Sequence, residues 1–595
     1  MAFSCAIPTA RSQVAFAADP APSASSADLA AARRLFETNL DAIRRRDRSA
    51  YLDCYLRSPR LARTGSTGIL MGYESLAGSA GSGWPDVFEA RDLELVPVSD
   101  GVVYGTYRYR VRYGDTEQTG LSERVFLRTP SGWRIAVTSA FPALEGTPAP
   151  AMTLVGATLI DGTGRTPVRD AVIVIREGRI ACAGPRTACG IPADSDTLDV
   201  RGLWVTPGLV DAHVHYSQTG WVDGRPDAVD VRDRYPYEEV QRRLRLHPEY
   251  FHRSWLGAGV TAVFDVGGYP WTVALQAPSE RDTRSPHVMA AGPLLSTLDF
   301  WLNLPAERQF IYLGSDSVAR AGVRYLKALG SAAVKVWFID TPTRDFADMQ
   351  RLVEVAGDEA ARVGLPLIVH ATGLREAKAA LRAGAHMLVH SVQDQPLDDE
   401  FLRLARRHST IYCPTLTVLD GYAKLYESGQ GPRLELDDPF HVVDSLTAAR
   451  VAGSPVALAG RIESRLSRLN DQRLRTALQQ VMAANLLKAK RAGIPVAMGT
   501  DAGNPLTLHG PAVYAEMEAM RRAGLTPMEV LVASTRNGAR AMGRSADFGT
   551  VERGKVADLV ILGADPVKDV RAWRSPRMVV RGGVVRAIEE FRQRP

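Results

Sequence analysis

Long hydrophobic runs are missing from this chain, and both lysine and cysteine are scarce. None of its 595 residues lies in an apolar run long enough to cross a bilayer, so we expect no membrane partner. The five cysteines include no C-x-x-C pair, which argues against a zinc finger. Only 8 of the 72 basic residues are lysines, and the formal charge of +6 is spread along the chain without dense basic tracts beyond triplets such as Arg44–Arg46. We therefore expect no nucleic-acid partner.

The few cysteines and the first residues bear on where the protein resides. Cys182 and Cys189 flank a short loop with Gly and Pro, and two alternatives stay open: a disulfide in an exported protein, or two free thiols in a cytosolic one. Ala15–Phe16–Ala17 resembles the end of a secretory signal, although the stretch before it lacks a basic start and a clean apolar core. Residues 1–27 are interpreted as a leader or degenerate signal segment, which favours a periplasmic or secreted location over a cytoplasmic one.

Residues 28–145 have the pattern of a compact α+β domain. Apolar residues recur at helical spacing from Leu29 to Ile43, and strand-like stretches follow over 92–98, 102–114 and 120–141. In the second stretch every other residue from Val103 to Val111 falls on one face, as in a half-buried antiparallel strand. Thr129–Gly132 predicts a hairpin turn within the third stretch.

The rest of the chain, after a linker over 145–150, predicts an α/β fold. Two strand-rich flanks, residues 152–206 and 545–595, are predicted to form one composite β-sandwich. Between them, over 207–544, eight strand candidates alternate with helical stretches, which is the count of a (β/α)8 TIM barrel. Residues 429–475 are longer than a plain connection needs and are interpreted as a lid or substrate wall.

Six side chains fall in or at the end of these strand candidates, and all are of metal-binding type. They are His213, His215, Lys335, His370, His390 and Asp501. The C-terminal ends of parallel barrel strands converge on the mouth of the barrel. Four imidazoles, one carboxylate and one lysine in one place predict a two-metal site, and such sites mostly perform hydrolysis.

Lys335 is the most informative of the six. It lies between Val334 and Val336 in an apolar strand, where a charged ammonium would be costly. A buried lysine can lose its proton, and the neutral amine can then take up CO2 as a carbamate that bridges two cations. The alternative is a strand-end lysine paired with an acidic neighbour. We predict N6-carboxylysine at Lys335 and two divalent cations; imidazole and oxygen ligands favour Zn²⁺, and Mn²⁺ or Co²⁺ also fit.

Several motifs resemble one known family over about residues 152–586. TPGLVDAHVH, VHATG, HS after the sixth strand candidate, GTDAG and GTVERGKVADLVIL are similar to motifs of the amidohydrolase superfamily. Within it the chain resembles the imidazolonepropionase-related branch that includes binuclear Xaa-Pro dipeptidase-like and ochratoxinase-like enzymes. The fourth strand lacks the glycine-rich continuation of the Xaa-Pro dipeptidases, so their substrate is not carried over. Outside this region, the opening helix, GYESL and GWRIAVTSAF resemble the NTF2-like (SnoaL-like) cone domain, read as an association or ligand-shaping unit.

The resemblance implies a role for each site residue. It places the more buried cation on His213, His215 and Asp501 and the more exposed one on His370 and His390. Carboxylated Lys335 and a hydroxide would bridge the two cations. Asp501 would be catalytic, accepting a proton and passing it to the leaving amine. His509, Arg225 and Tyr216 are the candidates for substrate contact, and the protein is expected to be a homo-oligomer.

Three functional hypotheses follow. The favoured one is a metal-dependent amidohydrolase that cleaves a peptide-like C–N bond of a small molecule, such as a dipeptide or an N-acyl amino acid. The second gives the same site an ester, lactone or cyclic amide as substrate. The third is a non-catalytic protein whose N-terminal domain binds a ligand or drives assembly while the barrel is a degenerate scaffold. A missing ligand residue would favour the third hypothesis, and none of the six is missing.

Overall fold

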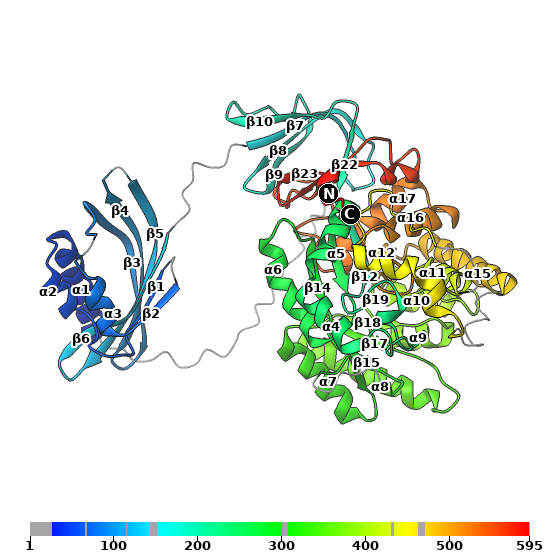
Figure 1. The fold of residues 1–595 in the computed structure, drawn as a ribbon, viewed down its shortest axis with the longest axis horizontal. Helices are drawn as coiled ribbons and strands as arrows, with labels where there is room; N and C mark the ends of the chain where they lie inside the picture. The colour runs from blue at the N-terminus through cyan, green and yellow to red at the C-terminus, as the bar shows by residue number, and fades with distance from the viewer. Residues whose placement is uncertain are drawn as a thin grey trace, which may run out of the picture. The chain divides into compact units, whose positions relative to one another are not determined.

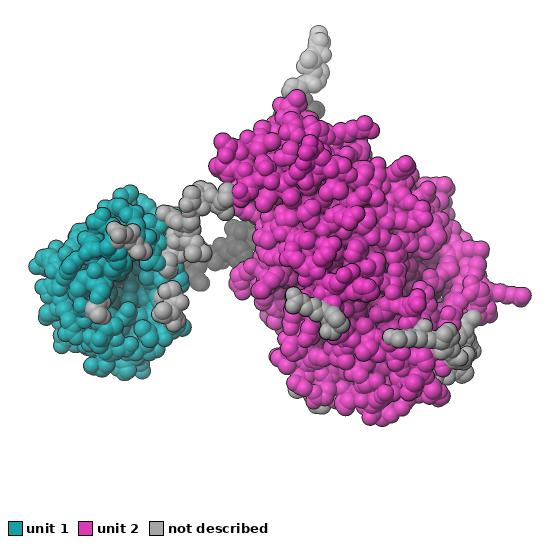
Figure 2. Space-filling view, turned by 45° about the horizontal axis from the view of Figure 1, so that its top comes forward, with its two compact units in different colours: residues 1–148 teal, residues 149–595 magenta. Residues whose placement is uncertain are grey.

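The computed structural model describes residues 26–65, 68–81, 83–114, 116–142, 151–299, 307–429, 434–461 and 471–593. The chain divides into two compact units, Met1–Pro148 and Ala149–Pro595, which Figure 2 colours separately. The proposed leader lies outside the described residues except for its last two, which begin the first helix. In the described part of the chain, no helix is both long and apolar enough to span a membrane.

The first unit packs three helices against one six-stranded sheet (Figure 1). The helices are α1 (Ser26–Arg44), α2 (Arg48–Asp53) and α3 (Tyr73–Ser79). The sheet runs in the order β2-β1-β6-β5-β4-β3, with bounds β1 (Ala62–Gly65), β2 (Gly68–Met71), β3 (Val87–Ser99), β4 (Val102–Tyr113), β5 (Thr116–Thr129) and β6 (Gly132–Pro142). Neighbouring strands from β3 to β6 are antiparallel, so this unit has the predicted α+β character.

The sequence patterns of this unit are confirmed in detail. Helix α1 buries Ala32, Phe36 and Leu40 against the sheet, because these residues recur on one helical face. Strand β4 alternates buried and less buried residues along its length, as its period of two predicts. Thr129 pairs with Gly132 across the β5–β6 turn. The likeness to an NTF2-like cone stays a prediction.

The second unit begins and ends in one shared sheet of eight strands. Its members are β7 (Ala151–Leu159), β8 (Val168–Arg176), β9 (Arg179–Pro185), β10 (Ser195–Asp199), β11 (Trp204–Pro207), β21 (Leu559–Leu562), β22 (Pro576–Arg581) and β23 (Val584–Ala587). Strand β11 pairs with β21, with Val205 opposite Ile561, and this pairing joins segments from the two ends of the unit. A disulfide joins Cys182 to Cys189, and the location of the protein stays a prediction.

Between these flanks, the nine short strands in the part of the chain that the structure describes all pair in parallel. They are β12 (Leu209–Val214), β13 (Val260–Asp265), β14 (His287–Ala290), β15 (Leu294–Ser296), β16 (Phe310–Tyr312), β17 (Val334–Trp337), β18 (Leu367–His370), β19 (Met387–Val389) and β20 (Ile411–Cys413). Helices separate most of them: α4 (Tyr237–Leu246), α5 (Glu249–Gly257), α6 (Gln276–Arg281), α7 (Asp316–Leu329), α8 (Phe346–Val363), α9 (Leu374–Arg382) and α10 (Asp399–Arg407). Later helices are α11 (Val418–Ser428), α12 (Ser445–Ala452), α13 (Ser454–Leu458), α15 (Gln472–Arg491), α16 (Ala512–Arg522), α17 (Pro527–Ser534) and α18 (Arg536–Ala541). The mixed α/β class is confirmed.

Two of the eight predicted strands differ from expectation. The third is interrupted between β14 and β15, where Gly292 adopts a left-handed φ of +69°. The eighth is not a regular strand: Val496 bridges β20 and Ala502 bridges β12, and Asp501 has a φ of +63° that a continuous ladder does not allow. The segment 496–502 nevertheless lies between β20 and β12. A closed (β/α)8 barrel stays a prediction.

Candidate metal centre

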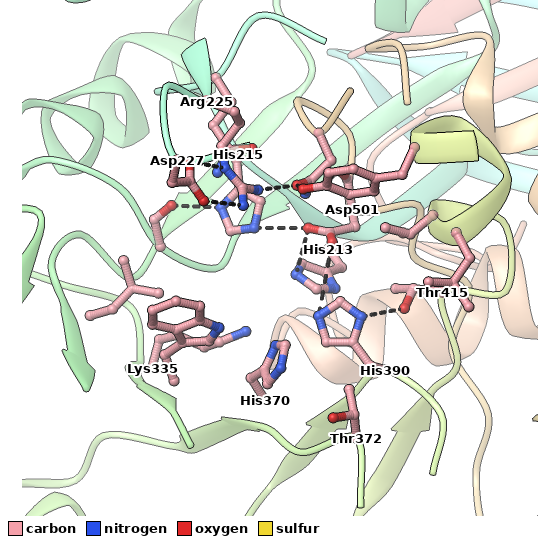
Figure 3. A pocket seen from close by; sticks show the side chains of 18 of the residues that line it. His213, His215, Arg225, Asp227, Lys335, His370, Thr372, His390, Thr415 and Asp501 are labelled. Atoms are coloured by element: carbon pink, nitrogen blue, oxygen red, sulfur yellow. Dashed lines mark hydrogen bonds and ion pairs between the residues drawn. The ribbon is translucent and has the colours of Figure 1, made fainter. Parts of the chain in front are cut away.

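The six ligand-type side chains meet around one cavity of about 240 Å³ (Figure 3). They lie within β12 and β17, at the end of β18, directly after β12 and β19, and in the segment 496–502. The parallel strands carry their C-terminal ends to the same side, so side chains that are far apart in sequence converge there. The six are His213, His215, Lys335, His370, His390 and Asp501.

Asp501 lies at the centre of the tightest group. Its Oδ1 is 3.1 Å from Nε2 of His213 and 2.9 Å from Nε2 of His215, and the ligand atoms of all three residues lie within 4.8 Å of one another. Both ring nitrogens of His213 are buried without a hydrogen-bond partner among the described residues, although one of them lies so close to the carboxylate. Buried polar atoms are almost always satisfied, so this arrangement fits a cation as their shared partner.

His370 and His390 form a second group beside the first. Their ring centroids are 4.4 Å apart, and Nε2 of His390 lies 3.9 Å from the other carboxylate oxygen of Asp501. Burial holds the pKa of both imidazoles well below its usual value, and neighbouring positive groups lower it further. Neutral imidazole is the form that binds metal, so both rings are in the state that a ligand requires.

Lys335 is buried in β17, with 2% of its surface exposed, and lines the same cavity. Burial lowers its pKa to about 8, because the apolar surroundings disfavour the ammonium. It makes no ion pair with any carboxylate in the described ranges, so the alternative of a lysine paired with an acidic neighbour is not what this geometry shows. The amine is therefore suited to lose its proton.

Two buried carboxylates hold the first group in place. Nδ1 of His215 lies 2.6 Å from the carbonyl oxygen of Gly267, whose own N–H donates to Asp265 over 3.0 Å. Nδ1 therefore carries the proton and Nε2 remains free for a cation. Asp211 accepts hydrogen bonds from the backbone N–H and the hydroxyl of Thr500, at 2.9 and 2.6 Å. Burial raises the pKa of Asp211 to about 7 and that of Asp265 to about 6.

A loop after β20 fixes the orientation of His390. Its Nδ1 lies 2.6 Å from the hydroxyl oxygen of Thr415. The next residues donate to the buried carboxylate of Glu516, from the N–H of Leu416 at 2.8 Å and the N–H of Thr417 at 3.0 Å. His390 and Thr415 both have left-handed φ values, +74° and +43°. Backbone strain of this kind persists only where surrounding contacts enforce it, and it concentrates at functional sites.

The remainder of the cavity wall combines polar side chains, among them Gln218, Gln309 and Gln393, with apolar ones. It includes Leu294, Phe310, Trp337, Leu419 and Met482. Arg225 lines the cavity as predicted, but its guanidinium is already engaged. Its Nε and Nη2 donate to Asp227 at 2.8 and 2.7 Å, and Nη1 donates to Asn504. No residue of the described stretch 434–461 lines the cavity, so this part of the predicted lid does not form its wall.

The structure does not bring Tyr216 or His509 into the cavity wall. The ring of Tyr216 is fully buried and packs 4.9 Å from that of Trp255. Tyr216 lies in the turn after β12, and its ring packs into the hydrophobic core away from the site. His509 stacks on Phe251 at 3.8 Å and its Nε2 lies 3.1 Å from the carbonyl oxygen of His215. It supports the backbone of a ligand and does not face the cavity.

The supporting residues Asp211, Asp265, Thr415 and Glu516 were not among the sequence candidates. Asp211 and Asp265 could have been found from the sequence, since an acidic residue within an apolar strand is unusual and indicates a specific role. Glu516 lies inside α16, a hundred residues from the loop that it holds, and no local pattern indicates that contact.

This strand-end cluster belongs to a recognisable family. Residues 204–586 match the model of the amidohydrolase family. The chain belongs to the amidohydrolase family. It is therefore a hydrolase that acts on amide-type bonds, and the resemblance to this superfamily is confirmed. The branch within the family stays a prediction.

Several proteins are similar to this amidohydrolase over most of their own length. An ochratoxinase from Aspergillus niger is 24% identical over 462 residues, which span 71% of this chain and 83% of that protein. An imidazolonepropionase from Rhizorhabdus wittichii is 28% identical over 430 residues, or 67% of this chain and 90% of that protein. A solved Xaa-Pro dipeptidase with bound methionine has a TM-score of 0.56 at 20% identity, covering 73% of this chain and 100% of the other. Molinate hydrolase has a TM-score of 0.55 at 21% identity, with coverages of 76% and 97%. At these identities the two structures establish a shared fold alone.

Proposed function

We propose that this amidohydrolase is a binuclear metal-dependent enzyme that cleaves the C–N bond of a small amide. The observation that carries the proposal is the position of Asp501, whose two carboxylate oxygens face two separate groups of histidines. A single carboxylate between two imidazole clusters suits a site for two cations. The parallel strands and the bridges of segment 496–502 to β20 and β12 support a closed (β/α)8 barrel around this site.

The ligands divide into two sets. His213, His215 and Asp501 would hold one divalent cation, and His370 and His390 the other. Lys335 would bridge both as N6-carboxylysine, formed when its neutral amine adds to CO2 and releases one proton. Its burial and its lowered pKa support this step. Imidazole and carboxylate ligands favour Zn²⁺, with Mn²⁺ or Co²⁺ as alternatives.

Divalent cations in such a site supply Lewis acidity and make water nucleophilic near neutral pH. The protein's own part is to move protons and to position the substrate. Asp501 would accept the proton of the attacking water and deliver it to the nitrogen of the leaving amine. Amines leave poorly unless protonated, so this transfer is what an amide substrate requires.

The cavity wall supports an amide with an apolar or aromatic group. Phe310 and Trp337 provide aromatic surface, and Leu294 and Met482 provide aliphatic surface. Arg225 is the basic side chain at the far side of the cavity from Lys335 in Figure 3, and would orient a substrate carboxylate through the N–H groups that Asp227 and Asn504 do not use. A dipeptide or an N-acyl amino acid has both features.

The test is hydrolysis of a panel of dipeptides and N-acyl amino acids by protein supplied with Zn²⁺, with release of free amine as the readout. We expect activity that Asp501→Asn abolishes and that Asp345→Asn preserves. Asp345 is an exposed helix cap on α8, and asparagine caps a helix as well as aspartate does. Hydrolysis of the matching esters or lactones without any of the amides would refute the amide proposal and favour the ester alternative.

A further inference from the structure

The N-terminal unit contains a cavity of its own. It measures about 330 Å³ and lies between helices α1 and α2 and the inner face of the sheet formed by β4, β5 and β6. This volume falls within the range of pockets that enclose small organic molecules. Five tyrosines contribute to its wall: Tyr51, Tyr55, Tyr107, Tyr109 and Tyr113. Nothing in the hydrolase chemistry of the second unit uses this cavity.

The unusual member of the wall is Arg124 on β5. Only 3% of its surface is exposed, and its guanidinium carbon lies 5.2 Å from the ring centroids of both Phe36 and Tyr107. Its Nη2 donates to the hydroxyl of Tyr107 over 2.9 Å. Its Nε and Nη1 have no hydrogen-bond partner, and it forms no ion pair, among the residues that the structure describes. A fully buried cation therefore lacks a counter-ion, and two of its three nitrogens, which carry three N–H groups, have no acceptor among the described residues.

Such an arrangement is costly for a protein that has no anion to bind. Arginine stays protonated under all ordinary conditions, so it cannot escape the cost of burial by losing its charge. Contacts with two aromatic rings offset part of that cost, because the ring faces are electronegative. They do not satisfy the free N–H groups, and unsatisfied buried donors are rare in folded proteins.

The charged residues around the cavity favour a negatively charged ligand. Its described wall contains two guanidinium groups, Arg63 and Arg124, and no aspartate or glutamate. One Nη of Arg63 donates a hydrogen bond to the hydroxyl of Ser79 over 2.8 Å. Because this partner is neutral, it does not compensate the charge of Arg63. A cation meets no carboxylate among the described wall residues, whereas an anion meets two positive charges.

We propose that this cavity binds a small aromatic carboxylate. The carboxylate would pair with the Arg124 guanidinium that lines the cavity, and the ring would pack among the tyrosines of β4. The carboxylate neutralises the buried charge, and the flat ring matches a wall of tyrosine side chains. This site is separate from the metal centre, and the proposal does not depend on the hydrolase function.

The experiment uses the full chain and three probes: benzoate, phenylacetate and 4-hydroxybenzoate, each titrated by calorimetry. Benzamide, which has the shape of benzoate without its charge, serves as the matched control ligand. We expect saturable binding of at least one carboxylate at one site per chain and no binding of benzamide at the same concentrations. Loss of the charged hydrogen bonds in Arg124→Met should weaken that binding by about 10-fold to 100-fold.

Three further variants make the result specific. Arg108→Met removes an exposed arginine from the neighbouring strand β4 and should leave binding unchanged. Arg225→Met removes the arginine of the barrel cavity and should also leave it unchanged, which excludes binding at the metal centre. Arg124→Lys keeps the buried charge but loses the planar array of donors, so it should weaken binding. It provides the test if Arg124→Met does not fold.

The free protein provides an independent readout. Since Arg124→Met removes an unpaired buried charge, we expect the ligand-free variant to melt at or above the temperature of the wild-type protein. Carboxylates should raise the melting temperature of the wild-type protein and not that of Arg124→Met. Binding by none of the three probes, equal binding of benzamide, binding that persists in both Arg124 variants, or binding lost in Arg225→Met would each overturn the proposal.

Discussion

Nδ1 of His390 lies 2.6 Å from the hydroxyl oxygen of Thr415, and this contact determines which ring nitrogen faces the cavity. Thr415 is followed by two residues whose N–H groups donate to the buried carboxylate of Glu516. The orientation of a proposed ligand is thus set by a chain of contacts that ends inside α16. Partners of this kind tune metal ligands almost as strongly as the ligands themselves do.

Replacing Thr415 with valine should therefore weaken the second cation specifically. We expect Thr415→Val to lower metal affinity by about 10-fold to 100-fold, measured by competition with a chelator. Thr410→Val is the matched control, since Thr410 is equally buried and donates to the carbonyl of Ala385, and does not line the cavity. Equal metal affinity in the two variants would show that Thr415 does not position the ligand.

Lys335→Ala should lose both metal and activity while the fold remains. The variant lacks the amine that would take up CO2, and propionate added to the buffer should restore part of the activity by supplying a carboxylate in the vacated space. Circular dichroism checks the fold and elemental analysis checks the metal. Lys327→Ala on the exposed face of α7 should behave as the wild-type protein. Full activity in Lys335→Ala without added carboxylate would refute the carbamate.

An ion cluster between β14 and the shared sheet predicts a pH dependence of stability. Nε2 of His287 lies 2.8 Å from Asp558, its Nδ1 lies 3.0 Å from Glu280, and Arg581 and Arg544 contact these carboxylates. Burial opposes protonation of His287, but the two carboxylates outweigh it and raise its pKa. Burial likewise opposes ionisation of Asp558, and His287 outweighs it and lowers that pKa.

The sign of the effect follows from these directions. A raised histidine pKa stabilises the fold below the unfolded pKa of about 6.5, and the contribution is lost as pH rises through the folded value. The lowered pKa of Asp558 stabilises above about pH 4 and is lost as pH falls. His287→Gln should thus cost about 1–3 kcal/mol of unfolding free energy at pH 6 and less at pH 9. Denaturant unfolding at both pH values measures this, with His408→Gln as an exposed control. A difference that grows toward pH 9 would contradict the assignment.

Removal of residues 1–148 should change assembly more than metal binding. These residues form one of the two compact units, and the six ligand candidates all belong to the other. We expect the shortened chain to keep the metal content of the full chain, measured by elemental analysis, and to differ in oligomeric state or solubility. If light scattering finds the same number of chains in each particle with and without these residues, a role of this unit in assembly is contradicted.

The site was predictable where it depends on strand ends. Each of the six residues lies in, ends or directly follows a short apolar run, and parallel strands carry such positions to one edge of the sheet. His213 and Lys335 could therefore be placed from local pattern alone. The likeness of GTDAG to a strand end also located Asp501, although its left-handed backbone breaks the strand.

Other features depend on contacts that no local pattern encodes. Glu516 supports a loop a hundred residues away, and Tyr216 faces a core because its neighbour already faces the cavity. The break between β14 and β15 lies at Gly292, which has a left-handed φ. The apolar residues on both sides of it made the segment look like one continuous strand. The lack of partners at Arg124 also depends on tertiary contacts. The strand pattern of β5 predicts which face of the sheet Arg124 occupies, but it does not predict which groups lie around the guanidinium.

The most direct test of the account is the metal content of the protein purified without chelator and then supplied with Zn²⁺ and bicarbonate. If the six cavity residues hold two cations through a carboxylated lysine, elemental analysis should find about two metal ions per chain. Mass spectrometry of the native protein should find one added CO2 on Lys335. One metal ion per chain would leave Lys335 a structural residue, and none would contradict the account.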